Sequence, residues 1–349
     1  MTTAASSEHA AVIGTGAWGL TLAMLLARNG VPTTLWARTA DEAAALRTTR
    51  HHPTRLTGVR LPDDLHVTDD LAAAVSPAAV VLVVVPSQTM RANAERLAPH
   101  LSREAIVVSA SKGIEIETSQ RMTEVLAAAL HTIPVERIGA LSGPNLGREI
   151  ADGLPATTVV AAPEEVVAMR VQRLLMSAAF RVYTHTDVIG VELGGVLKNI
   201  VALGAGLGDG LGLGDNAKAA FMTRGLAEIA RLGVAAGAQA LTFAGLAGVG
   251  DVVATCSSRL SRNRRTGEQL ARGVPLATIQ AQLGGVAEGV PTTRAARILA
   301  RRLGVEMPIT ELMYAVLFEG KDPRAASMEL MARDPKHELE GLRAQAASR

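Results

Sequence analysis

The lysines are the first residues in this chain to suggest chemistry, because they are scarce. Of 35 basic residues among 349, only five are lysines, and the other thirty are arginines. An ammonium group can lose its proton when it is removed from water, whereas a guanidinium group cannot. A lysine in an apolar segment is therefore a candidate acid or base. The five are Lys112, Lys198, Lys218, Lys321 and Lys336.

Lys198 has the most apolar surroundings of the five. If its segment is a helix, its neighbours one turn away are all small or apolar: Gly194, Gly195, Val201 and Ala202. Each glycine costs a helix about 1 kcal/mol, so we expect something to approach this face closely. A lysine held there could transfer protons. The alternative is that Lys198 extends to water or pairs with Glu192.

Lys112 follows a predicted strand, 106–109, in the sequence Ser111-Lys112-Gly113. Ligands of doubly wound sheets bind at the carboxyl ends of the strands, so Lys112 is a candidate ligand contact. The alternative is that Lys112 is an ordinary charged residue of a loop, with no role in ligand binding.

Four arginines fall within residues 259–265, directly around Ser261. Ser261 is predicted to cap the start of a helix, and arginines beside the free N–H groups of a helix start form an anion site. A solvated charged face is the alternative. Nucleic-acid binding is not supported, since the net charge is only +2 and aromatic residues make up 2% of the chain.

A glycine motif follows the first predicted strand, 10–13. Gly14, Gly16 and Gly19 form G-x-G-x-x-G, with Ala17 and Trp18 inside it, and a helical pattern follows. In this context the first glycine makes a tight turn, the second admits a pyrophosphate, and the third allows close packing of helix on strand. The motif predicts a dinucleotide site. The alternative is a glycine-rich turn without a cofactor.

The second predicted strand ends near Arg38. A site restricted to NAD usually has an acidic residue there, which binds the ribose 2′-hydroxyl. Here the nearest acids, Asp41 and Glu42, fall in the next predicted helix. A guanidinium suits a 2′-phosphate, so Arg38 allows or favours NADP. A solvated surface arginine is the alternative.

The elements that must position these residues differ between the two parts of the chain. Short apolar runs alternate with helical patterns up to about residue 185, which predicts a mostly parallel sheet. Long helical patterns then take over. We therefore expect a Rossmann-type dinucleotide-binding domain at 1–187 and an all-helical substrate and catalytic domain at 188–349. The predicted strands are 10–13, 33–36, 66–68, 80–85, 105–109, 138–141, 157–161 and 181–184.

Composition excludes several classes of protein. With 48% hydrophobic and 19% charged residues and a mean hydropathy of +0.23, the chain can bury a large core and is not disordered. One cysteine cannot form a disulfide within the chain, and the eight histidines show no metal-ligand spacing. The longest apolar run, 78–85, is far shorter than the ~20 residues of a membrane span. We expect a soluble, cytoplasmic protein with no membrane span and no metal site.

Eight motifs occur in an order that resembles the bacterial-type NAD(P)-dependent glycerol-3-phosphate dehydrogenases. They are IGTGAWG, VVVPS, SKG, SGPN, LGGVLKN, GLAGVGD, SRNRRTG and GGVAEGVPT, and the similarity extends from about residue 11 to residue 320. The resemblance implies an enzyme that interconverts dihydroxyacetone phosphate, a small phosphorylated triose, and sn-glycerol 3-phosphate with NAD(P)H. It also implies a supply of glycerol 3-phosphate for phospholipid synthesis, and a homodimer.

The resemblance assigns roles to individual residues. Its cofactor contacts, with the glycine motif, are Gly14, Gly16, Ala17, Trp18, Gly19, Arg38, Lys112, Gly147, Arg262, Val286 and Glu288. Its substrate contacts are Lys112, Gly143, Asn145, Lys198, Asp251, Ser261, Arg262 and Asn263. The chain departs from the family at Asn145 and Gly147, where the family usually has serine or threonine and then, two residues later, alanine.

The mechanism that the resemblance implies is direct hydride transfer without a metal. Lys198 would exchange the proton of the substrate oxygen, Lys112 would orient and polarise that oxygen, and Asp251 would hold Lys198 or a hydroxyl in place. Two other functions stay open. One is a β-hydroxyacid dehydrogenase of similar architecture, and the other is a catalytically silent NADP(H)-binding sensor.

Overall fold

The computed structural model describes residues 8–282 and 287–334. The chain forms two compact units, the first of residues 1–115 and 120–192 and the second of residues 116–119 and 193–349. The sequence placed the boundary between residues 187 and 188, where helix α8 (Val188–Leu211) begins. In the structure the two units divide after residue 192, inside that helix.

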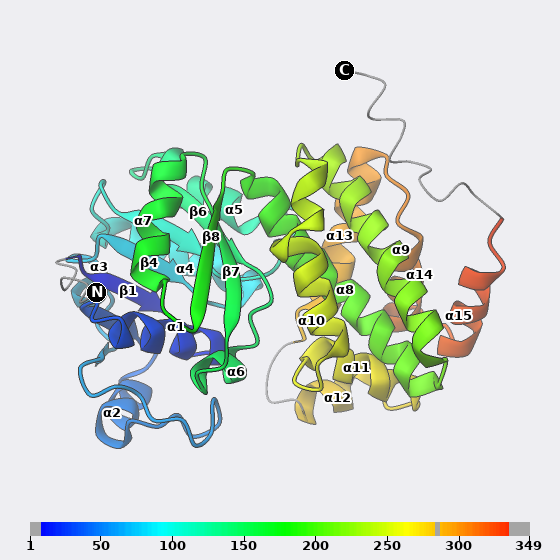
Figure 1. The fold of residues 1–349 in the computed structure, drawn as a ribbon, viewed down its shortest axis with the longest axis horizontal. Helices are drawn as coiled ribbons and strands as arrows, with labels where there is room; N and C mark the ends of the chain where they lie inside the picture. The colour runs from blue at the N-terminus through cyan, green and yellow to red at the C-terminus, as the bar shows by residue number, and fades with distance from the viewer. Residues whose placement is uncertain (1–7, 283–286, 335–349) are drawn as a thin grey trace. The chain divides into compact units, whose positions relative to one another are not determined.

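The described part of the first unit contains one eight-stranded sheet. All eight strands lie within two residues of the predicted ends, and several of them are labelled in Figure 1. The strand order is β3-β2-β1-β4-β5-β6-β7-β8. Every neighbouring pair is parallel except β6 and β7, which are antiparallel. The strands are β1 (Ala10–Ile13), β2 (Thr33–Trp36), β3 (His66–Thr68), β4 (Val80–Val83), β5 (Ile106–Ser109), β6 (Ile138–Ser142), β7 (Ala156–Ala161) and β8 (Phe180–His185).

Helices cover both faces of this sheet, which explains why its strands are apolar throughout. On β1, Val12 packs into one core with residues of α1 and α7, and Ile13 packs into a second core with residues of α4 and α5. The helices are α1 (Ala17–Arg28), α2 (Ala40–Thr49), α3 (Leu71–Val75), α4 (Met90–Leu97), α5 (Met122–Ala129), α6 (Gly147–Ala151) and α7 (Glu165–Leu175).

The strand order reverses at β1. The chain proceeds outward from β1 to β2 and β3 and then returns to place β4 on the other side of β1. Doubly wound sheets bind their ligands at the carboxyl end of the strands beside such a reversal. The glycine motif, which follows β1 directly, therefore lies where a dinucleotide binds in this fold.

The second unit is helical throughout the part that the structure describes. Its helix α8 is the one described helix that is long and apolar enough to cross a membrane, but 89% of its apolar stretch is buried inside the structure. The other helices are α9 (Gly214–Ala235), α10 (Asp251–Ser257), α11 (Arg262–Ala271), α12 (Leu276–Gln282), α13 (Gly289–Leu303), α14 (Pro308–Phe318) and α15 (Pro323–Met331), with a π-helical turn at Leu246–Gly250.

Helices α8 and α11 touch through their backbones. A Cβ atom on Gly206 of α8 would lie 1.9 Å from the carbonyl oxygen of Arg264, and one on Gly267 of α11 would lie 1.9 Å from that of Leu203. Side chains can rotate away from such a clash, but backbone atoms of packed helices cannot. Glycine is therefore required at this crossing, which fixes the start of α11 relative to α8.

We expect Gly206→Ala to lower the free energy of unfolding by about 1–3 kcal/mol, the usual cost of overpacking, even though alanine favours a helix. Gly208→Ala is the matched control on the same helix. Among the described residues outside its own stretch of helix, a Cβ there meets only a methyl group of Leu213, at 3.9 Å. Urea denaturation of both variants should show Gly208→Ala equal to or more stable than the parent protein. Equal stabilities of the two variants would contradict the backbone contact.

Candidate functional site

The glycine motif forms an open loop in front of helix α1. Gly14 has φ +116°, and a Cβ on it would lie 2.5 Å from the carbonyl oxygen of Val84. A Cβ on Gly19 would lie 2.1 Å from the carbonyl oxygen of Gly14. Gly16, by contrast, is exposed, and apart from its own neighbours along the chain no atom of the described residues lies within 4 Å of its Cβ position. The fold thus requires the first and third glycines, and the second leaves space for a ligand.

The start of α1 fits an anionic group in that space. The helix begins at Ala17 with no side-chain cap and no acidic residue in its first turn, so its N–H groups and the positive end of its dipole are available. Beside them, the indole nitrogen of Trp18 is buried without a hydrogen-bond partner in the described part of the chain. A buried donor of this kind fits a site that a cofactor completes.

Arg38 is exposed and follows β2 after one residue. Thr39 caps the next helix, α2, by accepting a hydrogen bond from the N–H of Glu42 at 3.3 Å. Asp41 and Glu42 therefore belong to α2, as the sequence predicted. The strand-end position that carries an acid in sites restricted to NAD carries a cation here.

Three residues that the resemblance assigns to the substrate lie together at the carboxyl ends of β5 and β6. The Lys112 ammonium donates to the carbonyl oxygen of Gly143 at 2.9 Å. The Asn145 amide donates to the hydroxyl of Thr158 at 3.0 Å, while its own oxygen is buried without a partner among the described residues. The substitution of asparagine at 145 thus leaves a free acceptor.

Gly147 begins the short helix α6 beside α1. Its carbonyl oxygen accepts a hydrogen bond from the Thr21 hydroxyl at 3.0 Å, and a Cβ on Gly147 would lie 3.1 Å from that hydroxyl oxygen. Gly147 therefore allows α6 to pack closely against the helix that begins at the glycine loop.

Lys198 is buried in the second unit, and it is paired. Its Nζ lies 3.1 Å from a carboxylate oxygen of Asp251 and 2.5 Å from the hydroxyl of Thr255. Thr255 in turn donates to the same Asp251 oxygen at 3.1 Å. The side chains of Lys198 and Asp251 are only 9% and 2% exposed. The structure thus brings together two of the three predicted catalytic residues.

Thr255 was not predicted, although the sequence carried a signal for it. It is the fourth residue after Asp251 on α10, and residues four apart share one face of a helix.

Glu192, which the sequence offered as an alternative partner of Lys198, pairs with other residues. Glu192 accepts from Arg121 at 2.5 Å and from the backbone N–H of Thr123 at 2.9 Å. Burial raises the pKa of Glu192, and Arg121 opposes that shift.

The glycines before Lys198 have the expected consequence. A Cβ on Gly194 would lie 2.5 Å from the carbonyl oxygen of Ala247, in the π-helical turn that precedes α10. The close approach inferred from the sequence is therefore made by the protein's own backbone. This contact brings α10, and with it Asp251, against α8.

Both the nitrogen and the oxygen of the Asn263 side-chain amide form hydrogen bonds. It donates to the side-chain oxygen of Asn199 at 2.8 Å and accepts from the backbone N–H of Gly289 at 3.0 Å. Asn199 directly follows Lys198, and sequence reasoning missed it. Because Asn199 occupies one N–H of the Asn263 amide, the second N–H remains the donor that Asn263 could offer a substrate.

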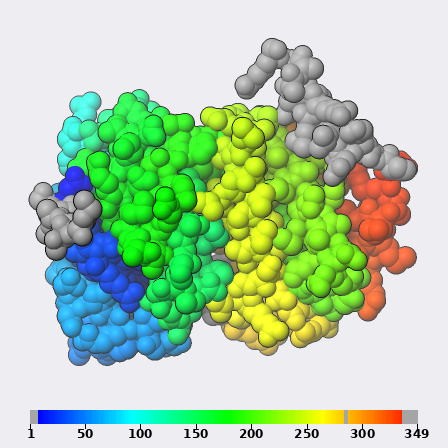
Figure 2. Space-filling model, in the orientation of Figure 1, coloured from blue at the N-terminus to red at the C-terminus, as the bar shows by residue number. Residues whose placement is uncertain are grey.

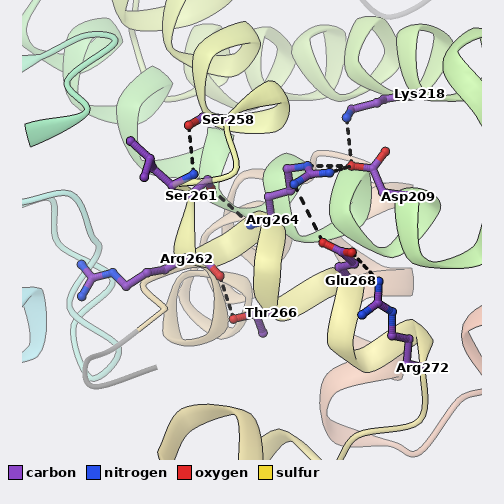
Figure 3. Close-up of polar contacts among 10 residues, drawn as sticks. Asp209, Lys218, Ser258, Ser261, Arg262, Arg264, Thr266, Glu268 and Arg272 are labelled. Atoms are coloured by element: carbon purple, nitrogen blue, oxygen red, sulfur yellow. Dashed lines mark hydrogen bonds and ion pairs between the residues drawn. The ribbon is translucent and has the colours of Figure 1, made fainter. Parts of the chain in front are cut away.

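The arginine cluster divides into two kinds of residue (Figure 3). Ser261 caps α11 by accepting from the N–H of Arg264 at 3.2 Å, as predicted. The Arg264 side chain is bound to Asp209 at 2.6 Å, and Lys218 binds the same carboxylate at 2.9 Å. Arg262 extends away from that network in Figure 3. Arg264 is thus a structural residue, and Arg262 remains the candidate anion ligand at the helix start.

Three further features complete the second unit. Glu288 is the residue before α13, and Val286 lies outside the described residues. Cys256 is buried on α10, and this burial raises the pKa of its thiol to about 12, although nearby Lys198 opposes the shift. A cavity of about 1380 Å³ lies among α8, α9, α14 and α15, and neither Lys198 nor Arg262 lines it.

These features define a class of protein. An open glycine loop at the reversal of a doubly wound sheet accepts a dinucleotide, and a buried, oriented lysine can carry the proton that accompanies a hydride. Together they characterise the dinucleotide-dependent dehydrogenases. Family models narrow the class: the N-terminal model of NAD-dependent glycerol-3-phosphate dehydrogenase matches residues 9–168, and the C-terminal model matches residues 187–328. The chain belongs to this family.

Known proteins agree with this assignment. The chain is 50% identical to glycerol-3-phosphate dehydrogenase [NAD(P)+] of Streptomyces griseus, over 94% of this chain and 98% of the relative. It is also 50% identical to the enzyme of the same name from Moorella thermoacetica, over 95% and 98%. A crystal structure of glycerol-3-phosphate dehydrogenase from Coxiella burnetii matches with a TM-score of 0.89 and 36% identity, covering 93% of this chain and 99% of that one.

Proposed function

We propose that Lys198 is the acid and base of an enzyme that interconverts dihydroxyacetone phosphate and sn-glycerol 3-phosphate with NAD(P)H. Such an enzyme supplies glycerol 3-phosphate for phospholipid synthesis. The observation that carries the assignment of Lys198 is its burial against Asp251 and Thr255. A lysine that served only solubility would not be held by two buried polar groups in the core of a helical unit.

Bound NAD(P)H supplies the hydride to the substrate carbonyl carbon. During reduction, Lys198 Nζ gives a proton to the oxygen of that carbonyl, and during oxidation it takes the proton back. Asp251 forms an ion pair with Nζ and, with Thr255, orients it. After reduction the neutral amine regains its proton from water.

The substrate phosphate needs a separate binding group, for which we propose the start of α11. Ser261 caps this helix start, and the Arg262 guanidinium beside it is a group that can bind phosphate through two parallel hydrogen bonds. Asn263 offers an amide N–H for a substrate oxygen. In the first unit, Lys112, Gly143 and Asn145 are proposed substrate contacts.

One assay tests this function against its rivals. Loss of NADPH absorbance should depend on dihydroxyacetone phosphate, and no comparable oxidation of a 3-hydroxy acid should occur with NADP⁺. A β-hydroxyacid dehydrogenase would give the reverse pattern. A silent sensor would bind NADPH and turn over neither substrate.

We expect NADPH to be used at least as well as NADH, because a cation replaces the strand-end acid at Arg38. Arg38→Asp should raise the KM for NADPH and shift the preference toward NADH, since the carboxylate repels a 2′-phosphate and binds a 2′-hydroxyl. Initial rates with both cofactors measure this preference. If the ratio of the two kcat/KM values did not move, Arg38 would be a surface residue only.

The homodimer implied by the resemblance is part of this proposal, as is a cytoplasmic location. Sedimentation velocity of the purified chain at micromolar concentration tests the first. A monomer under those conditions would contradict it.

A further inference from the structure

Glu42 is an acidic residue in the first turn of α2, and its side chain does not make the capping contact that its position in that helix predicts. Thr39 and Glu42 have the spacing of a capping box, in which the glutamate returns to the N–H of the capping residue. In the structure the Glu42 carboxylate instead accepts a hydrogen bond from the Thr15 hydroxyl at 2.6 Å. Thr15 lies between Gly14 and Gly16 in the glycine loop.

A histidine holds the same carboxylate oxygen. His52 Nε2 lies 3.4 Å from Glu42 Oε1. The other ring nitrogen of His52 accepts from the backbone N–H groups of Thr54 and Arg55, at 3.2 and 3.0 Å, so the ring proton is on Nε2 and points to Glu42. Burial lowers the pKa of His52, and Glu42 opposes that shift, so the ring is neutral at pH 7.5.

The carboxylate is therefore fixed beside the cofactor loop. Figure 2 shows the light-blue segment of α2 and its following loop against dark-blue residues from the start of the chain. The Glu42 side chain is 28% exposed, and Thr15 and His52 both contact its Oε1. Its second oxygen, Oε2, is thus the one placed to accept a further hydrogen bond.

The chemistry of this position is known from the fold. In doubly wound dinucleotide sites, an acid about 20 residues beyond the glycine motif accepts a hydrogen bond from the ribose 2′-hydroxyl. Arg38 stands where that acid is expected at the end of β2. Glu42 lies four residues later, on α2, and its side chain places a carboxylate beside the glycine loop.

We propose that Glu42 binds the 2′-hydroxyl of the adenosine ribose and so determines how well the enzyme uses NADH. Arg38 and Glu42 then bind different cofactors. The Arg38 guanidinium favours the 2′-phosphate of NADPH, and the Glu42 carboxylate favours the 2′-hydroxyl of NADH. The chain accepts both cofactors because each has its own partner.

The test measures dissociation constants of NADH and NADPH by fluorescence titration at pH 7.5. Glu42→Gln removes the charge and keeps the shape. It should weaken NADH about tenfold or more, the size of one charge-assisted hydrogen bond, while NADPH is unchanged or tighter because a repulsion is lost. Equal changes for both cofactors, or none, would overturn the proposal.

Two variants separate a cofactor contact from a structural role. Asp41→Asn removes the same charge from an exposed neighbouring position and should leave both constants unchanged; a shift like that of Glu42→Gln would show a general charge effect and overturn the proposal. Thr15→Val removes the anchor of the carboxylate in the loop and should weaken NADH more than NADPH, since the freed carboxylate then misses the hydroxyl. Equal weakening of both cofactors would show that Thr15 serves the loop itself, and would overturn the proposed positioning of Glu42.

A variant that fails to fold does not end the test. If Glu42→Gln lowers Tm by more than a few degrees, Glu42→Asp retains the charge with a shorter reach, and its ratio of constants should move in the same direction by a smaller factor. An unchanged ratio overturns the proposal. This inference rests on the proposed use of NAD(P)H, and the parent protein separates the two claims. If the parent protein binds neither cofactor, the proposed function is refuted. If it binds both, but the ratio of the NADH and NADPH dissociation constants is the same in the Glu42 variants, only the proposed role of Glu42 is refuted.

Discussion

Replacing Lys198 with methionine should lower kcat by roughly 10²–10⁴-fold, while the affinity for NADPH stays near that of the parent enzyme. The loss is the usual contribution of one positioned acid or base. Methionine keeps the length and apolar volume of the lysine stem but removes the ammonium beside the buried Asp251 carboxylate, so a thermal unfolding curve must show that the variant is folded at the assay temperature. Steady-state rates with dihydroxyacetone phosphate, together with an NADPH titration, separate the two quantities.

Two comparisons make this result specific. Lys198→Arg keeps the charge next to Asp251 but cannot give up a proton at neutral pH, so it should not restore turnover. Lys321→Met is the matched control, since Lys321 pairs with Glu329 near the surface of the second unit. Near-normal turnover in Lys198→Met would exclude Lys198 as the acid and base.

Removing the Arg262 guanidinium should cost at least about 3 kcal/mol in kcat/KM, the scale of a desolvated contact between two charges. Binding energy from the non-reacting phosphate can orient the carbonyl carbon for hydride transfer, so Arg262→Ala should lower kcat as well as raise KM. Kinetics with dihydroxyacetone phosphate measure both effects. Arg272→Ala, at the other end of α11 and 63% exposed, should have no such effect.

A substrate without phosphate tests which group Arg262 binds. Dihydroxyacetone should be a poor substrate and should lose far less from Arg262→Ala. Added phosphite should partly restore its turnover in the parent enzyme and not in the variant. An equal loss on both substrates would mean that Arg262 serves the fold or the cofactor. Arg264 could not then take its place, because Asp209 already neutralises it.

The fold was largely predictable because its signals are local. Each strand is a short apolar run, and the glycine motif marks the turn after β1, so eight strands and the long helices could be located from the sequence. The direction of β7 could not be predicted. Its residues are as apolar as those of a parallel strand, and nothing in a single strand states which way it runs beside β6.

The site was predictable as a set of residues but not as a set of contacts. The scarcity of lysines pointed to Lys198, and the Ser261 cap followed from residue type. The pairing of Lys198 with Thr255 depends on how α8 and α10 cross, and that crossing follows from the close contact of Gly194 with Ala247. The reach of Glu42 to Thr15 contradicts the local capping pattern, so only the tertiary structure could show it.

The buried thiol of Cys256 makes this chain convenient for site-directed labelling. Burial raises its pKa to about 12, so very little thiolate forms at pH 7, and the sulfur is shielded from reagents. Because it is the only cysteine, a second one introduced at an exposed position such as Leu241, which is 85% exposed, would react alone with a maleimide dye. Fluorescent derivatives can therefore be made without first removing a native cysteine from the helix that carries Asp251.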